Sequence, residues 1–226
     1  PPRSTLFPYT TLFRSLELAY KNNFEGVILY ATPIKPLNTA LYLQLRNKGI
    51  KVAHLSPYCM DMSKETSFFP DYYQTGLVAA AKFAVAGYRH VLMYPQNFES
   101  PCVTLAFDGC RKMGEQLGLD IRLLENNLPF GEIVRRAGAL DGRTAIFCID
   151  TDIGAKIAGS PGYDSRRMGI CALWRPYRSE EEISCFYYDD EQQITDAFLY
   201  VSDPGRSPFE TICRKYDPMF QDKKSF

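Results

Sequence analysis

The sequence predicts an α/β protein in which parallel sheets are covered by helices on both faces. Short apolar runs typical of buried parallel strands alternate with longer stretches that favour helix along most of the 226-residue chain. Apolar residues make up 46% of the chain, which is enough to bury a core of real size. The number of expected strands favours two lobes, each with its own sheet, over a single sheet.

The alternation begins at Leu16. The segment LELAYKNN favours the end of a helix, and FEGVILYA contains the unbroken apolar run of a strand buried on both faces. Gly49 and Gly87 are expected helix stops, because helices commonly end at a glycine in the left-handed conformation. Strands are therefore expected at 24–31, 50–56 and 90–95, helices at 16–23, 32–49, 71–87 and 103–118, and a loop rich in Pro, Ser and Met at 57–70.

The second half of the chain repeats the pattern. The segments TAIFCID and RRMGICALW have the composition of buried strands. The helix at 103–118 is expected to be amphipathic, with Leu105, Cys110, Met113 and Leu117 on one side. Further strands are expected at 119–125, 144–150, 166–174 and 183–189, helices at 129–140, 151–159 and 190–203, and a closing edge strand within 209–220.

Charge, hydropathy and cysteine spacing argue against several classes of function. Lys plus Arg and Asp plus Glu number 26 each, so the chain lacks the basic excess of a module that grips nucleic acid. No run approaches the roughly 20 apolar residues that cross a bilayer. The seven cysteines form no CxxC pair, which argues against zinc and redox motifs and favours reduced structural thiols in a cytoplasm.

The first fifteen residues are expected to be foreign to the protein. Residues 5–15 spell TLFPYTTLFRS, the in-frame translation of a common sequencing-adapter oligonucleotide. The alternative is an ordinary apolar N-terminus, for example a signal peptide, but Pro8, Arg14 and the scattered Thr and Tyr residues interrupt the apolar core that a signal peptide needs. We therefore expect the natural sequence to begin near Leu16 and the segment before it to be missing.

Several short motifs follow one another in a fixed order along residues 16–226. They are FEGVIL, GIKVAHL, FFPDYYQTGLVAAAKFAVAGYRHVLMY, FDGCRKMGEQLGL, RTAIFCIDTDIGAKI, SRRMGICAL and MFQDKKSF. This ordered series resembles the effector-binding domain of LacI/GalR-type transcriptional regulators. The resemblance implies a two-lobed fold similar to type I periplasmic binding proteins, with a ligand in the cleft between the lobes and a homodimeric assembly.

The resemblance also implies how the chain is divided. One lobe would comprise about residues 16–88 and 187–204, and the other about 89–186 and 205–226. The chain would cross between the lobes three times. The family's first strands and its helix-turn-helix should precede Leu16, so DNA would be contacted only through the missing part.

Two aspartates stand where they could contact a ligand. Asp150 ends a buried strand, where a carboxylate can accept hydrogen bonds from ligand hydroxyls and where the family often has a ligand-binding Asn. Asp71 begins a helix, so it is an N-cap, a residue at the rim of the cleft, or both. Either Asp150 or Asp152 could serve only as the cap of the helix that follows, and we expect Asp150 to contact the ligand and Asp152 to be the cap.

Other candidates lie at strand and helix ends. Phe130 opens the helix at 129–140, near where the family often has an aromatic ring, although a core position fits it as well. Trp174 is the only tryptophan and follows a strand, as a cleft wall would. Gln96 and Asn97 follow the strand at 90–95, where they serve either the ligand or a surface turn.

Two departures from the family pattern concern the ligand. The family's Arg three residues before Gly109 is replaced by Ala106, which is expected to line the pocket. The family's Asp after the strand is replaced by the Cys171–Ala172 region. Both changes remove polar groups that hold sugar hydroxyls, so a less polar ligand or other donors are expected.

The motifs predict binding rather than catalysis. GxSxG, P-loop and GxGxxG motifs are absent from the sequence, and neither His54 nor His90 lies beside a Ser or Cys nucleophile motif. We therefore expect no enzyme, cofactor or metal site, but a cytoplasmic sensor of a sugar or sugar-like metabolite. The alternatives are an extracytoplasmic solute-binding protein of a transporter and a sugar-processing enzyme, and the latter lacks a candidate acid/base pair.

Overall fold

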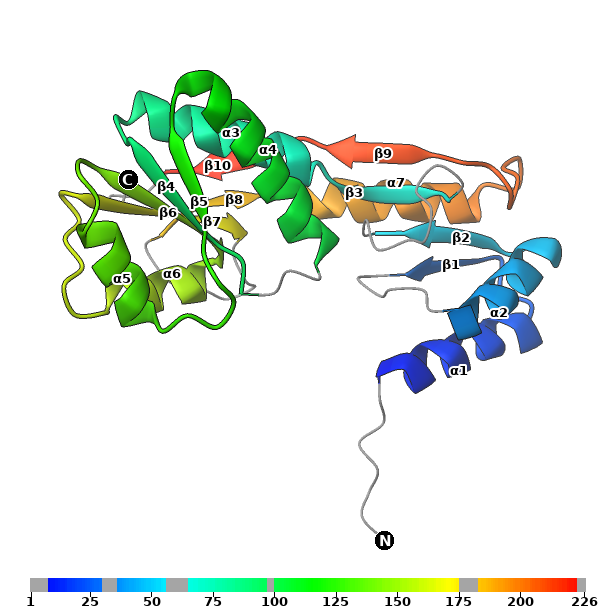
Figure 1. Ribbon diagram of the computed structural model, residues 1–226. Helices are drawn as coiled ribbons and strands as arrows, with labels where there is room; N and C mark the ends of the chain where they lie inside the picture. Colours follow the sequence, from blue (N-terminus) through cyan, green and yellow to red (C-terminus); the bar gives the residue numbers. More distant parts are fainter. Residues whose placement is uncertain (1–7, 30–35, 56–64, 97–99, 175–182, 223–226) are drawn as a thin grey trace, which may run out of the picture. The chain divides into compact units, whose positions relative to one another are not determined.

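The computed structural model describes residues 8–29, 36–55, 65–96, 100–174 and 183–222 (Figure 1). They form two compact units. Unit 1 comprises Pro1–Pro70 and Asp189–Tyr216, and unit 2 comprises Asp71–Tyr188 and Asp217–Phe226, so the chain passes three times from one unit to the other.

Unit 1 is built on a four-stranded parallel sheet with the order β1-β2-β3-β9. Three helices accompany this sheet, and α7 contacts β1, β2 and β3. The elements are α1 (Pro8–Lys21), β1 (Gly26–Leu29), α2 (Pro36–Asn47), β2 (Lys51–His54), β3 (Ser67–Pro70), α7 (Asp190–Ser202) and β9 (Cys213–Tyr216).

The sheet of unit 1 buries both of its faces, as the apolar composition of its strands predicts. On one face Val52 of β2 belongs to a cluster with Leu16 of α1 and Leu45 of α2. On the other face Ala53 belongs to a cluster with Ala197 of α7. The alternation follows from the strand geometry, in which successive side chains point to opposite faces.

Unit 2 is built on a six-stranded sheet with the order β10-β8-β7-β6-β4-β5. All neighbouring strands are parallel except β10, which runs antiparallel to β8 at the edge. The elements are α3 (Tyr72–Val85), β4 (His90–Tyr94), α4 (Pro101–Leu117), β5 (Asp120–Leu123), α5 (Phe130–Gly138), β6 (Thr144–Asp150), α6 (Thr151–Ala158), β7 (Met168–Trp174), β8 (Ser184–Tyr187) and β10 (Met219–Gln221).

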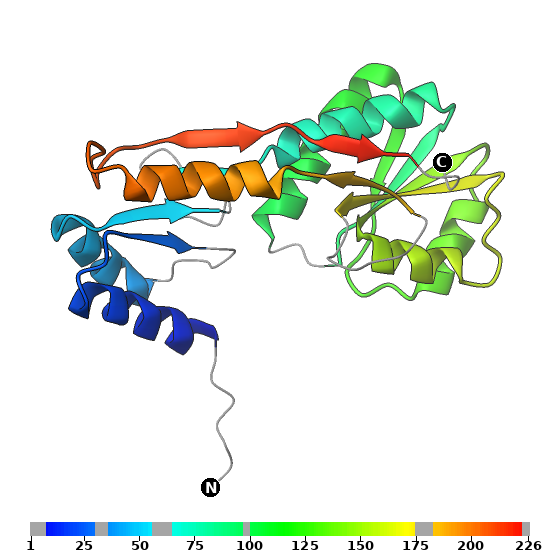
Figure 2. The ribbon, with the colours of Figure 1, turned by 180° about the vertical axis from the view of Figure 1, so that it is seen from behind.

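Helices cover both faces of this second sheet (Figures 1 and 2). On one face the ring of Phe147 lies 6.0 Å from that of Phe83 on α3 and 5.5 Å from that of Phe107 on α4. On the other face Thr144 donates a hydrogen bond to the carbonyl of Ala137 on α5. The expected α/β fold with parallel sheets between helices is therefore confirmed.

The division of the chain between the two units falls at other residues than those expected for the lobes. Helix α3 was expected in the first lobe, but it packs on α4 and belongs to unit 2. Residues 205–216 were expected in the second lobe, but they lead into β9, which pairs with β3 in unit 1. The partner of β9 is distant in sequence, whereas α4 is simply the next helix after α3.

Three further expectations need correction. Strand β3 lies inside the segment expected to be a loop, and the expected closing strand is two strands, β9 and β10, in different units. Of the predicted face of α4, Cys110 is fully buried and Met113 packs against the core, but Val103, Ala106 and Phe107 form most of the rest of the buried face. Leu117 of that set is 45% exposed. Helix α4 packs on α3 through small residues such as Gly109 and on the sheet through larger ones such as Phe107, and Leu117 takes part in neither contact to a large extent.

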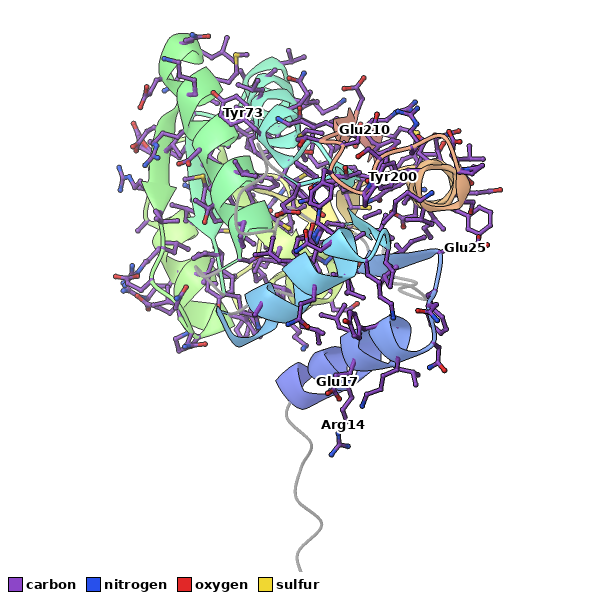
Figure 3. All side chains as sticks on the ribbon, turned by 90° about the vertical axis from the view of Figure 1, so that its right-hand side faces the viewer. Arg14, Glu17, Glu25, Tyr73, Tyr200 and Glu210 are labelled. Atoms are coloured by element: carbon purple, nitrogen blue, oxygen red, sulfur yellow. The ribbon has the colours of Figure 1, made fainter. Side chains whose placement is uncertain are left out.

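Helix α1 runs across the position at which the natural sequence was expected to begin. The buried side chains described on this helix are Leu16 and Ala19, which pack in unit 1. Arg14 is exposed and points away from the helix (Figure 3). Among the side chains described on α1, those that pack into the core therefore all follow Ser15.

Candidate functional site

The carboxyl ends of the parallel strands in unit 2 form one edge of its sheet. Ligands of open α/β sheets bind at this edge, because the loops that follow the strands and the N-termini of the next helices converge there. The parallel strands described in this sheet end at Tyr94, Leu123, Asp150, Trp174 and Tyr187. The edge therefore contains two of the residues predicted from the sequence.

Asp150 and Trp174 are direct neighbours at this edge. They are register partners on β6 and β7, so their side chains share one face of the sheet. Both side chains are partly buried. The Oδ1 atom of Asp150 accepts a hydrogen bond of 2.8 Å from the backbone N–H of Ile153, which makes Asp150 the N-cap of α6. The expectation that Asp152 caps this helix was wrong, because Asp152 is already inside α6 and is exposed.

An aromatic pair lies on the same face. Tyr94 is the register partner of Cys148, two residues before Asp150, so the alternation of the strand places Tyr94 and Asp150 on one side. The ring of Phe130, the first residue of α5, meets the Tyr94 ring edge-on at 6.3 Å between centroids. Tyr94 donates a hydrogen bond of 3.3 Å to the carbonyl of Leu128, and burial raises its pKa.

This arrangement places a carboxylate and an indole on the face that also holds a tyrosine–phenylalanine pair. Carboxylates accept hydrogen bonds from hydroxyl groups, and aromatic faces pack against apolar C–H surfaces. Such a set of side chains can recognise a small ligand that combines both properties.

Asp71 lies on the opposite side of the sheet. It caps α3 by accepting a hydrogen bond of 3.1 Å from the N–H of Gln74, and α3 packs on the face that carries Phe147. The predicted capping role is therefore confirmed. A contact of Asp71 with a ligand stays a prediction.

A tyrosine joins the start of α3 to the end of β7. The hydroxyl of Tyr188 lies 3.0 Å from that of Thr75 and donates a hydrogen bond of 3.4 Å to the carbonyl of Leu173. Its ring meets Tyr72 edge-on at 5.5 Å, and burial raises its pKa. This neutral hydroxyl holds the strand end beside Trp174 in place.

The remaining predicted residues have other surroundings. Gln96 is exposed with a φ of 44°, a left-handed conformation typical of a turn. Asn97 lies outside the described residues. Ala106 was expected to line the pocket, but it is fully buried in the contact between α4 and α3, where its methyl group presents no surface to a ligand.

Sequence reasoning did not name Tyr94 and Tyr188. Tyr94 could have been found, because it is the last residue of an expected strand and precedes Pro95. Tyr188 could not, because its partners Thr75 and Leu173 are brought to it by the fold.

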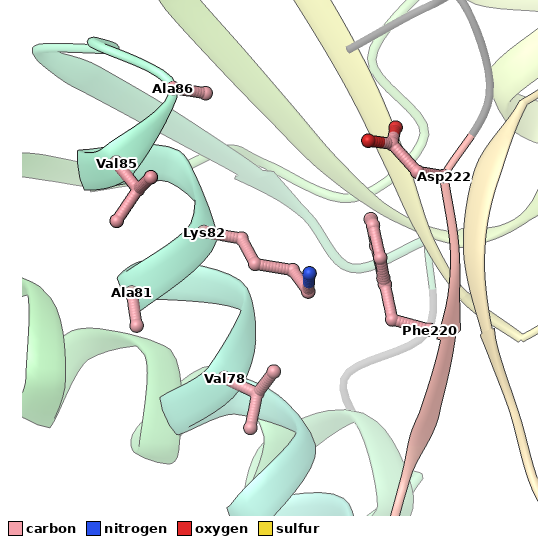
Figure 4. Close-up of a pocket in the computed structure, with 7 residues that line it drawn as sticks. All are labelled: Val78, Ala81, Lys82, Val85, Ala86, Phe220 and Asp222. Carbon is pink, nitrogen blue, oxygen red and sulfur yellow. The ribbon is translucent and has the colours of Figure 1, made fainter.

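Two surface hollows of unit 2 contain none of the predicted residues. One has a volume of about 390 Å³ and lies between α3 and β10, where Lys82 extends toward the Phe220 ring, 4.0 Å from its centroid (Figure 4). The other, of about 310 Å³, lies along β5 and α5. Its arginines are paired, Arg122 with Asp120 and Arg136 with Glu125 and Glu132.

The thiols of unit 2 are unsuited to chemistry. Cys148 and Cys171 are completely buried, as predicted, and burial raises the pKa of both. Burial also raises the pKa of Cys110 to about 12. A thiol is reactive as the thiolate, so these cysteines act as small apolar groups.

The part of the chain that the structure describes offers neither a metal cluster nor a membrane-spanning helix. Within it, no group of three His, Cys, Asp or Glu side chains is arranged to hold a metal ion. None of the helices described is long and apolar enough to span a bilayer.

Comparison with known proteins gives matches at the level of structure. No protein-family model matches the sequence, and no curated protein matches it. A probable maltose operon repressor of Staphylococcus aureus aligns with a TM-score of 0.75 at 12% identity, over 96% of this chain and 81% of its own. A periplasmic solute-binding protein of Actinobacillus succinogenes with bound D-allose aligns with a TM-score of 0.77 at 11% identity, over 96% and 83%.

A sugar-binding transcriptional regulator of the LacI family from Enterococcus faecalis also aligns, with a TM-score of 0.66 at 10% identity, over 94% of this chain and 83% of its own. The fold is thus that of LacI-family sensors and of type I periplasmic binding proteins. The resemblance stated from the sequence motifs is confirmed for the fold.

Proposed function

We propose that the chain binds a small neutral carbohydrate or sugar-like metabolite at the carboxyl edge of the unit 2 sheet. The observation that carries this proposal is the placement of Asp150 beside Trp174 on one face of that edge. In this proposal the carboxylate accepts hydrogen bonds from ligand hydroxyls, and Trp174 and Phe130 contact the C–H surface of the ligand.

The carboxylate of Asp150 can accept further hydrogen bonds, which supports the proposal. Among the described contacts, only its Oδ1 atom is engaged, by the N–H of Ile153. A carboxylate has about four lone-pair positions, so a ligand hydroxyl can be accepted without loss of the cap. A negative charge on the ligand would be repelled by Asp150, so we expect neutral sugars to bind better than sugar phosphates.

Tryptophan fluorescence tests this site directly. Trp174 is the only tryptophan, so any change in indole emission reports on the end of β7. The titrants are D-allose, maltose, D-ribose and myo-inositol, with glucose 6-phosphate as the anionic comparison. A saturable change with at least one neutral titrant is expected, and a response to the phosphate alone would contradict the proposal.

A pair of variants separates Asp150 from a general effect of charge. Asp150→Asn should weaken binding by about 1–3 kcal/mol, the contribution of a hydrogen bond to a charged group. The matched control is Asp152→Asn, which removes an exposed charge two residues along the chain. An equal loss in both variants would end the assignment of Asp150.

We further propose that the chain is the sensor part of a cytoplasmic LacI/GalR-like regulator, and that it forms a homodimer in the intact protein. Five buried free cysteines in unit 2 support a reducing compartment over the alternative, an extracytoplasmic solute-binding protein. Ligand would act by favouring one of two arrangements of the protein. The gene sequence upstream of Leu16 is the test: a helix-turn-helix encoded there would support the regulator, and a signal peptide would support the solute-binding protein.

A further inference from the structure

The hollow of about 390 Å³ in unit 2 lies between helix α3 and strand β10 (Figure 4). Strand β10 pairs with β8 on one side and stands last in the order of its sheet. The backbone groups of alternate β10 residues therefore point away from β8, and no other described strand lies there to pair with them. The hollow is thus a groove between a helix and the edge of a sheet.

The α3 wall of this groove is largely apolar. The side chains that line it are Val78, Ala81, Lys82 and Val85, whose spacing of three and four residues places them in one stripe along the helix. Val85 is 91% exposed, although valine is among the residues most often buried. Phe83, on the opposite side of α3, is fully buried and holds the helix on the sheet. The stripe therefore offers apolar surface to another molecule.

Lys82 gives the groove a positive charge that the described residues do not neutralise. Its Nζ atom lies 4.0 Å from the centroid of the Phe220 ring, which holds the ammonium group over the groove. Among the described side chains, no carboxylate forms an ion pair with Lys82. The carboxylate at the end of the groove, Asp222, accepts a hydrogen bond of 3.3 Å from Ser184 instead. The charge of Lys82 is therefore complementary to an anionic group of a bound molecule.

We propose that this groove binds an extended, acidic segment of a partner protein, which adds a strand to β10. Apolar side chains at alternate positions of the segment pack on Val78 and Val85, and an Asp or Glu of the segment pairs with Lys82. A groove between a sheet edge and a helix suits such segments, because main-chain hydrogen bonds give affinity and alternate side chains give specificity. The groove shares no residue with the proposed carbohydrate site, so this inference goes beyond the proposed function.

Selection from a phage-displayed library of short random peptides tests the proposal on the whole chain. The counter-bait is Val85→Glu, which places a negative charge on the apolar stripe. Because Val85 is exposed, this variant should keep its melting temperature within about 3 °C of the unaltered chain. The peptides enriched over the counter-bait should have apolar residues at alternate positions and at least one Asp or Glu. A selection that enriches no peptide over Val85→Glu overturns the proposal.

Backbone methylation of a selected peptide distinguishes strand addition from apolar contact alone. In a pair of strands, every second residue directs its N–H toward the partner strand. Two series of peptides are therefore methylated, one at the odd and one at the even backbone nitrogens. Fluorescence anisotropy should show that binding is lost in one series and kept in the other. An equal effect in both series contradicts the addition of a strand to β10.

Lys82→Met removes the charge and keeps an unbranched side chain over Phe220. It should weaken the binding of the selected acidic peptides about two- to fivefold, the effect of one partly exposed ion pair. The difference from the unaltered chain should shrink at high salt, which screens such pairs. Lys112→Met on α4 is the matched control, because Lys112 is exposed and lies outside the groove. An equal loss in both variants contradicts the proposal, since the attraction would then come from the overall charge.

Sedimentation of the chain without peptide decides between a partner protein and a second copy of this chain. Self-association that Val85→Glu abolishes overturns the proposal, because the groove then binds another copy. A state of association that is the same in both proteins supports it. Carbohydrate titrations followed by Trp174 emission should also be the same in Val85→Glu and in the unaltered chain. Failure of this inference therefore leaves the proposed function intact.

Discussion

Gly76 of α3 and Gly109 of α4 face each other's helix backbone. A Cβ atom on Gly76 would collide with the carbonyl oxygen of Ala106, and one on Gly109 would collide with that of Tyr73. The two helices can approach this closely only because neither residue has a side chain. Ala106 stands at this contact, since its carbonyl oxygen is the atom that a Cβ on Gly76 would meet, and its own side chain is fully buried.

Gly76→Ala is therefore expected to destabilise the protein severely. The new methyl group meets backbone rather than a movable side chain, so the helices must separate, and we expect a loss of more than about 3 kcal/mol. Gly131→Ala on α5 is the control, because a Cβ there meets nothing within 4 Å. It should stabilise the protein by about 0.5–1 kcal/mol in urea unfolding. A small loss of stability in Gly76→Ala would show that α3 and α4 can move apart at little cost in free energy.

Asp150→Ala is expected to lose stability as well as ligand. Removal of an N-cap costs about 0.5–2 kcal/mol, whereas Asp150→Asn retains a capping oxygen. Asp189→Ala is the matched control, since Asp189 caps α7 through the N–H of Gln192 at 2.8 Å. It should show a similar loss of stability in thermal melting without a change in carbohydrate affinity. A ligand effect of Asp189→Ala as large as that of Asp150→Ala would show that affinity follows stability alone.

Glu65 is expected to make stability depend on pH. Burial raises its pKa from 4.5 to about 7, so the folded protein favours the protonated carboxyl. Because the folded-state pKa is the higher one, this contribution is complete below pH 4.5 and is lost as the pH rises through about 7. The melting temperature of Glu65→Gln relative to wild type should therefore rise between pH 5 and pH 8.

Glu115→Gln, which removes an exposed carboxylate on α4, is the control for the loss of a charge as such. A relative stability of Glu65→Gln that falls with increasing pH would mean that the ion pair of Glu65 with Arg46 outweighs burial.

Deletion of residues 1–15 is expected to have little effect. The described side chains that bury α1 in unit 1 begin at Leu16, and Arg14 and Ser15 are exposed. We expect the melting temperature to change by less than about 3 °C, which corresponds to about 1 kcal/mol in a chain of this size. Leu16→Ala is the comparison and should cost about 2–5 kcal/mol, since the side chain is fully buried. A drop of many degrees after the deletion would show that the first residues are part of the fold.

The sequence predicts those elements whose signal is local. Strand β6 is an unbroken apolar run before an aspartate, and α3 is an alanine-rich helix that ends at a glycine, so both were found with small errors at their ends. Strand β3 has only four residues, and its extended pairing is with β9, far along the chain. Nothing near Ser67 in the sequence contains that information.

The candidate site also combines residues that the local sequence predicts with contacts that only the fold creates. Asp150 and Trp174 could be named because each ends a strand that is visible in the sequence. Their adjacency depends on the register of β6 against β7, which is set by packing between segments. Ala106 could not be placed, because its burial depends on a glycine of another helix.

The cores of the two units differ in their continuity. In unit 2 one cluster of buried residues runs through both faces of the sheet, whereas unit 1 has two smaller clusters on opposite faces. Regions with few buried apolar contacts open locally at lower free energy, so amide hydrogens should exchange more slowly in β6 and β7 than in β1. A protease that cleaves transiently unfolded segments would then cleave unit 1 first. The lifetime of the protein in a cell would therefore depend on the local stability of unit 1, the smaller of the two.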